Sequence, residues 1–148
     1  MHNTLASSDY GLLDEDTLAP RPDYWAALFW KRTMGNVVLD PGVSKNQSLR
    51  VYAHCSKSGK GGVTLVALNT DTEHEQVLIL PSSAETFTLT ASDLTSTSVM
   101  LNGAELRAES DGSVGPFKAQ DRKKGSFRLA PASVTFLTFP SARNKVCM

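Results

Sequence analysis

The apolar run over residues 24–30, Tyr-Trp-Ala-Ala-Leu-Phe-Trp, constrains the fold more than any other feature of the chain. Pro22 opens a helix predicted over residues 23–34, with an acidic residue in its first turn and two basic residues in its last, as the helix dipole favours. Gly35 follows where a C-terminal cap glycine belongs. A helix that is apolar on nearly every side must be buried against a large surface. We expect the rest of this chain to be too small to cover it.

After Gly35 the pattern changes to a period of two residues, which is typical of β-strands. Over residues 49–55, the apolar or small residues at odd positions alternate with Arg, Tyr and His at even positions. Further strands are predicted over residues 63–68, 76–80, 86–90, 98–101, 105–107, 126–129 and 133–139. Residues 58–62 read as a hairpin connection, and Asn102-Gly103 is a strong hairpin signal. Short strands separated by turns predict a mainly β fold, an antiparallel β-sandwich over residues 36–148 preceded by a helical segment over residues 1–35.

Length and charge exclude several functional classes. The chain has 148 residues and carries 15 Lys and Arg against 15 Asp and Glu, so it has no overall basic field to hold nucleic acid or an anionic membrane. No apolar run approaches the roughly 20 residues that cross a bilayer. Residues 1–10 show neither the basic nor the apolar region of a secretory signal. We therefore expect no nucleic-acid partner, no transmembrane segment and no signal peptide in this chain.

Two cysteines, Cys55 and Cys147, are too far apart in sequence for a CxxC redox or zinc motif. They are either a disulfide that ties the C-terminal tail to the domain or two unrelated thiols, and spacing alone leaves both interpretations open. A disulfide would require an oxidising compartment. The sequon Asn46-Gln47-Ser48 points the same way, since it predicts N-glycosylation at Asn46 in a polar loop.

The residues themselves predict no catalytic apparatus. The three histidines lack metal-ligand spacing, so neither a metal nor a cofactor is expected. No Gly-x-Ser-x-Gly elbow is present. The paired carboxylates that glycoside hydrolysis would need lie in turns or beside a short strand, and none ends a buried strand, where burial raises the pKa of an acid catalyst. The basic run Arg122-Lys123-Lys124 is either a solvated loop or a contact for an acidic polymer.

Several long, ordered motifs nevertheless resemble the C-terminal third of plant heparanase-like proteins, members of glycoside hydrolase family 79. They are Asp9-Tyr10-Gly11-Leu12-Leu13, Pro22-Asp23-Tyr24-Trp25-Ala26-Ala27-Leu28-Phe29-Trp30-Lys31-Arg32, Met34-Gly35, Leu49-Arg50-Val51-Tyr52-Ala53-His54-Cys55-Ser56-Lys57, Leu101-Asn102-Gly103 and Cys147. The resemblance extends over nearly the whole chain from about Leu5. It implies a (β/α)8 barrel followed by a β-sandwich, with residues 1–35 as a remnant of the last strand and helix of a truncated barrel.

The resemblance also implies where the chemistry lies. The family's two catalytic glutamates, an acid/base and a nucleophile, stand at the ends of earlier barrel strands, upstream of this chain. The family's substrate-binding Gly-Asn-Tyr loop matches Ser8, Asp9 and Tyr10, of which only the tyrosine is retained. The resemblance further implies a disulfide between Cys55 and Cys147. It also implies a product that is secreted, placed in the cell wall, or delivered to the lysosome or vacuole.

Three hypotheses follow. The first is the C-terminal part of a heparanase-like hydrolase of β-glucuronide linkages in polysaccharides or glycoconjugates, inactive alone and meeting acidic polysaccharide only within the full-length protein. The alternative is a non-catalytic β-sandwich that binds a polysaccharide or a protein through His54, the basic run at 122–124 and exposed aromatics. The third is a truncated gene product without function, in which Trp25, Phe29 and Trp30 form an adhesive patch.

Overall fold

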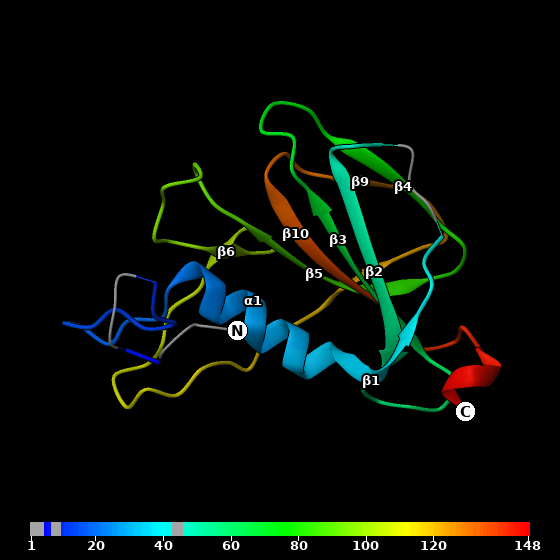
Figure 1. Cartoon of the computed structure of the whole chain (residues 1–148), viewed down its shortest axis with the longest axis horizontal. Helices are drawn as coiled ribbons and strands as arrows, with labels where there is room; N and C mark the ends of the chain where they lie inside the picture. The colour runs from blue at the N-terminus through cyan, green and yellow to red at the C-terminus, as the bar shows by residue number, and fades with distance from the viewer. Residues whose placement is uncertain (1–4, 7–9, 43–45) are drawn as a thin grey trace.

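The computed structural model describes residues 5–6, 10–42 and 46–148. One helix, α1 (Pro22–Thr33), lies across one face of a large antiparallel sheet, and a second, two-stranded sheet covers the other face (Figure 1). The layers are therefore helix, large sheet and small sheet. The prediction of a mainly β chain with antiparallel pairing is confirmed.

Eight of the described strands form the large sheet, in the order β1-β2-β3-β10-β5-β6-β7, and β8 pairs with β5 beside this path. Its long central members are β2 (Leu49–Ser56), β3 (Val63–Asn69), β10 (Ser133–Phe139) and β5 (Ala84–Thr90). The shorter members are β1 (Met34–Leu39), β6 (Met100–Leu101), β7 (Ala104–Glu105) and β8 (Gln120–Arg122). The turn between β6 and β7 is the predicted Asn102-Gly103, and both of its residues have a positive φ, of 51° and 89°.

The small sheet pairs β4 (Gln76–Leu80) with β9 (Gly125–Leu129). Its inward side chains, Leu80, Phe127 and Leu129, pack against residues of β2, β3, β5 and β10 in one continuous core cluster. Apolar side chains thus fill the space between the two sheets, which is the hydrophobic contribution that holds β4 and β9 in place. A short 3-10 helix, η1 (Lys145–Cys147), ends the chain.

The sheet buries one face of the helix, which corrects in part the expectation that this chain is too small to cover it. Trp25 and Phe29 are each 1% exposed and pack with Val66, Leu89 and Phe136 of the sheet. Trp30 remains 40% exposed and meets the ring of His54 edge-on, with 5.2 Å between ring centroids. The adhesive patch that supported the third hypothesis is therefore reduced to Trp30.

The end of the helix also differs from the prediction, because Gly35 is not its cap. The helix ends at Thr33, and Met34 is already extended, with φ −86° and ψ 127°, as the chain enters β1 directly. A Cβ atom at Gly35 would lie 2.5 Å from the carbonyl oxygen of Cys55. Glycine is therefore needed here for the close approach of β1 to β2, and not for a left-handed turn.

Candidate functional site

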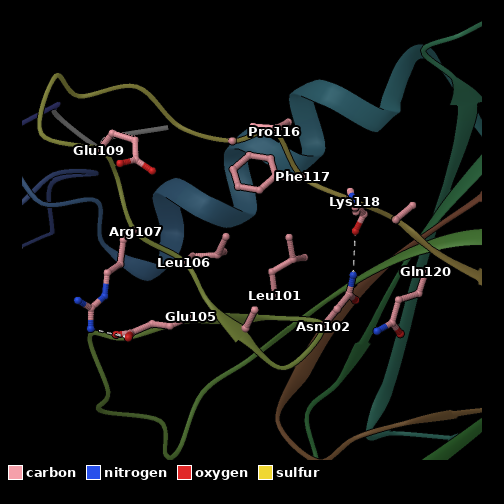
Figure 2. A pocket seen from close by; sticks show the side chains of 13 residues that line it. Leu101, Asn102, Glu105, Leu106, Arg107, Glu109, Pro116, Phe117, Lys118 and Gln120 are labelled. Carbon is pink, nitrogen blue, oxygen red and sulfur yellow. Dashed lines mark hydrogen bonds and ion pairs between the residues drawn. The ribbon is translucent and has the colours of Figure 1, made fainter.

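An open groove of about 520 Å³ lies between residues 101–109, which include the β6–β7 hairpin, and the segment over residues 115–120 (Figure 2). Leu101 and Leu106 line its apolar part, and Phe117 comes from the segment opposite them. Phe117 also contacts the core of the helix layer, with its centroid 6.2 Å from that of Trp25 and 5.1 Å from that of Phe29. The groove therefore combines an apolar floor with a polar rim.

Hydrogen bonds between neighbouring segments build the polar rim of this groove. Asn102 accepts a hydrogen bond from the backbone N–H of Thr88 (2.9 Å) and donates one from Nδ2 to the carbonyl oxygen of Lys118 (3.2 Å). Arg107 donates to Glu105 over 2.6 Å, and Ser98 donates to the same carboxylate over 3.1 Å. The side-chain hydrogen bond from Arg107, with that from Ser98, lowers the pKa of Glu105. Glu105 is thus held ionised, the opposite of what a general acid requires.

Other described carboxylates close turns. Asp14 accepts hydrogen bonds from the backbone N–H and the hydroxyl of Thr17, and these two bonds, with one from Arg21, lower its pKa to about 2. Backbone N–H groups of Glu73 and His74 lower the pKa of Asp71 in the same way. Hydrogen bonds from Thr95 and Ser113 lower the pKa values of Asp93 and Asp111. A carboxylate that accepts such bonds is stabilised in its charged form and serves the local fold.

The predicted substrate loop is only partly visible. Ser8 and Asp9 lie outside the described residues, and Tyr10 is 62% exposed. Tyr10 lines none of the hollows described for this chain's structured part. Tyr10 is therefore not part of the groove of Figure 2, and a site made of Ser8, Asp9 and Tyr10 stays a prediction.

The predicted disulfide is present. Cys55 of β2 and Cys147 of η1 are bonded, with Cα atoms 5.3 Å apart across 92 residues of sequence. The bond is reinforced by two backbone hydrogen bonds, from Gly61 N–H to the carbonyl oxygen of Cys147 and from Asn144 N–H to that of Gly61 (both 2.9 Å). The C-terminal tail is therefore fixed beside the β2–β3 turn (Figure 1).

Asn46, the predicted glycosylation site, is exposed before β2, and its Nδ2 donates to the side-chain oxygen of Gln76 over 2.5 Å. His54 is half-buried, and its Nδ1 lies 2.7 Å from the carbonyl oxygen of Gly35, so it joins β2 to β1. Of the basic run, Arg122 ends β8, and Lys123 and Lys124 are exposed in the turn to β9.

Sequence reasoning did not foresee the groove of Figure 2, because the sequence predicts no strand or helix between residues 107 and 126. Only Phe117, one aromatic residue among polar neighbours, signalled that this loop packs against the fold. No cluster of three or more His, Cys, Asp or Glu side chains suited to a metal ion occurs among residues 5–6, 10–42 and 46–148. In the same described residues, no helix is both long and apolar enough to cross a membrane.

Known proteins with similar sequences come from one group. The chain is 35% identical to a hyaluronoglucuronidase of Hirudo nipponia over 162 aligned positions, covering 99% of this chain and 33% of that protein. It is 34% identical to the baicalin-beta-D-glucuronidase of Scutellaria baicalensis, covering 93% of this chain and 27% of that protein. It is 52% identical to heparanase-like protein 1 of Arabidopsis thaliana over 66 positions, covering 45% of this chain and 12% of that protein.

The first two of these relatives are glucuronidases by name. The chain belongs to the heparanase-like family, glycoside hydrolase family 79. It spans a third or less of the length of each of these three relatives. No family model matches the chain.

Proposed function

We propose that this chain is the C-terminal part of a heparanase-like glycoside hydrolase that acts on β-glucuronide linkages of polysaccharides or glycoconjugates. The observation that carries the proposal is the match to a hyaluronoglucuronidase along 99% of this chain but only 33% of that relative. A segment that matches from end to end while covering a third of an enzyme corresponds to one part of that enzyme.

We further propose that the chain does not contain the catalytic glutamates and is inactive alone. Retaining glycosidases need an acid/base carboxyl and a nucleophile about 5–5.5 Å apart, and the acid must have a raised pKa. The carboxyls whose pKa is shifted in this chain, Asp14, Asp71, Asp93, Glu105 and Asp111, are all shifted downward. This direction supports roles in turns and ion pairs.

In the same proposal, residues 1–35 derive from the last strand and helix of a (β/α)8 barrel, and residues 36–148 are a β-sandwich domain. The exposed flank of α1, including Trp30, is available to further protein on the side away from the sheet. Tyr10, together with Ser8 and Asp9, would stand at the rim of the substrate cleft of the full-length enzyme. The exposure of Tyr10 is compatible with that role.

Secretion, or delivery to the cell wall, lysosome or vacuole, is proposed from the disulfide, because such bonds persist in oxidising compartments. The same route would expose Asn46 to glycosylation. A drop in mass after enzymatic removal of N-glycans, abolished by Asn46→Gln, would support glycosylation at Asn46. An unchanged mass would contradict glycosylation at this site.

The function is tested first by the mass of the endogenous protein, detected with an antibody against residues 140–148. A species much larger than 16.0 kDa is expected, and its immunoprecipitate should hydrolyse an aryl β-glucuronide. The recombinant 148-residue chain should not. Turnover by the pure chain that is lost in Glu105→Gln would overturn the proposed absence of catalytic carboxyls, and an endogenous species at 16.0 kDa would overturn the enzyme assignment.

A further inference from the structure

Four turns that are far apart in sequence meet at one end of the large sheet. They are residues 57–62, 81–83, 122–124 and 140–148, here called the cationic end. Strand register brings them together, because Val63 pairs with both Cys55 and Phe139, and Ala84 pairs with Arg122. The bond between Cys55 and Cys147 holds the last of these segments against the first.

The cationic end concentrates positive charge in a chain whose net charge is zero. It contains seven of the chain's 15 Lys and Arg and none of its 15 Asp and Glu. The seven are Lys57, Lys60, Arg122, Lys123, Lys124, Arg143 and Lys145. The only acidic neighbours that line a hollow there are Glu85 and Asp121.

These cations are largely unused by the fold. None of the four ion pairs found among the described residues involves them. Lys57 donates to the carbonyl oxygen of Lys31 over 3.0 Å, and Arg122 donates to the side chain of Gln120 over 2.5 Å. Lys123 and Lys124 lie in the turn between β8 and β9 and are exposed. Their charge is therefore available to an anionic ligand.

Two adjoining hollows lie at the cationic end. One, of about 430 Å³, is lined by apolar side chains of Val63, Leu65 and Phe139. The other, of about 470 Å³, is lined by hydroxyl and charged side chains, two basic and two acidic: Ser83, Arg122, Lys123, Glu85 and Asp121. Ser82 and Ser141 line both hollows, so the two adjoin; together they are here called the groove, with an apolar half and a charged, hydroxyl-rich half.

We propose that the cationic end is a binding site for an acidic polysaccharide. A uronic acid ring presents an apolar C–H face, hydroxyls and a carboxylate, and the groove offers an apolar wall, serine hydroxyls and Arg122 with Lys123 as their complements. A linear polyanion can also reach Lys60, Lys124 and Arg143 on neighbouring turns. This inference goes beyond the proposed function, because it assigns binding to the 148-residue chain itself.

The surface fits a polysaccharide better than the other polyanions. Single-stranded nucleic acid is held by exposed aromatic side chains on which bases stack. The four segments of the cationic end contain no Phe, Tyr or Trp, and Phe139, which lines the apolar hollow, is only 3% exposed. A lipid surface is broad and flat, so its headgroups would not enter a recessed groove. Sulfate and carboxylate groups are both suitable anions for these side chains, and two probes separate them: hyaluronan carries carboxylates alone, whereas heparin carries both.

The test measures the affinity of the whole chain for hyaluronan and heparin oligosaccharides by calorimetry at low salt, with neutral dextran as the blank. Lys123→Ala/Lys124→Ala should weaken binding about tenfold or more, because fewer counterions are released on binding. The matched control is Arg50→Ala/Arg128→Ala, which removes the same charge from the opposite end of the strands. It should change the affinity by less than about twofold, since it lies more than a Debye length of about 10 Å away along the strands. Ser141→Trp fills the groove without changing charge and should also abolish tight binding.

Binding of hyaluronan would assign the site to carboxylates, and binding of heparin alone would assign it to sulfates; both support the proposal. Failure of either polymer to bind would overturn it. Equal weakening by the two double variants, or full affinity in Ser141→Trp, would show a diffuse charge effect and would also overturn it. Tighter binding to phosphatidylserine vesicles or to DNA than to either polysaccharide would replace the polysaccharide by that partner. None of these outcomes depends on glycosidase activity.

Discussion

The two ends of the large sheet differ in the sign of their charge and in how the fold uses it. The end opposite the cationic end, here called the acidic end, comprises residues 14–16, 70–75, 91–98 and 105–113. It holds ten of the 15 Asp and Glu and one of the 15 Lys and Arg. At this end the carboxylates of Asp14, Asp71 and Asp93 accept hydrogen bonds from nearby residues and close turns. At the cationic end, Lys123 and Lys124 point into solvent.

The difference shows that a zero net charge says little about local function. All four ion pairs of the described residues include a carboxylate at the acidic end, so those charges are partly neutralised within the chain. The cationic end is held instead by the disulfide and by apolar packing around Phe139. Charges that the fold does not need are free to bind a partner, whereas charges that close turns are not.

The largest effect is expected from removing the covalent link at the cationic end. Cys55→Ala/Cys147→Ala should lower the free energy of unfolding by about 4 kcal/mol, because the bond closes a loop of 92 residues in the unfolded chain. Urea unfolding of the variant and of the wild type, oxidised and reduced, measures the loss. The reduced wild type should match the variant. A loss below about 1 kcal/mol would mean that packing alone fixes this end.

The next effect is expected at the acidic end, at the buried Asn69. Its Nδ2 donates to the carbonyl oxygens of His74 (2.8 Å) and Ala130 (2.9 Å), and its Oδ1 accepts from the N–H of Asp71 (3.0 Å). Asn69→Ala removes all three hydrogen bonds, and of the three backbone groups only the carbonyl of Ala130 keeps a partner, the hydroxyl of Ser133 (2.6 Å). The substitution should therefore cost about 3 kcal/mol in the free energy of unfolding. The control is Thr70→Ala, at the residue that follows Asn69. It removes the exposed hydrogen bond from the Thr70 hydroxyl to the carbonyl oxygen of Ser48 and should cost less than about 1 kcal/mol. Similar losses for both variants would argue against a special role for Asn69.

A smaller effect is expected on the pH dependence of stability, which should differ between the two ends. Hydrogen bonds from Thr17 lower the pKa of Asp14 from 3.8 to about 2, and similar bonds lower that of Asp71. Since these pKa values are lower in the folded state, the carboxylates stabilise the fold above pH 3.8, and this contribution is lost as the pH falls toward 2. Denaturant midpoints measured from pH 6 to pH 2 should therefore fall less steeply in Asp14→Asn/Asp71→Asn. Asp121→Asn is the control at the cationic end, since its carboxylate accepts no hydrogen bond from a described residue; an equal flattening there would contradict the assignment.

The smallest effect is expected from the exposed lysines. Lys123→Ala/Lys124→Ala should leave the denaturant midpoint unchanged, because exposed charges without partners contribute little to stability. The measurement is urea unfolding at low and at high salt. A clear loss of stability would mean that the fold does use these charges, and it would weaken the contrast between the two ends.

The strands with strong alternation could be predicted from the sequence. Residues 76–80 and 133–139 form strands with the predicted bounds, and residues 49–55 extend by one residue in β2. β8 was missed because Gln120, Asp121 and Arg122 are all exposed, so no buried face marks the strand. β1 was missed because it follows α1 without a turn, and its central residues are exposed. Edge strands of this kind are held by backbone hydrogen bonds to a neighbouring strand. They therefore depend on the sequence of that neighbour as well as on their own.

The sequence by itself determined one helix, predicted over residues 23–34 and found over Pro22–Thr33, most of the strands and the balance of 15 basic against 15 acidic residues. These are local properties: they depend on side-chain periodicity, on turn residues and on counting. Only the tertiary structure decided that Trp25 and Phe29 are buried by the sheet of this same chain, and that four separated turns meet at the cationic end. Both depend on which strands pair, and the strand pairing places Cys55 and Cys147, 92 positions apart in sequence, close enough to bond. A pattern of neighbouring residues contains no information on contacts between residues so far apart.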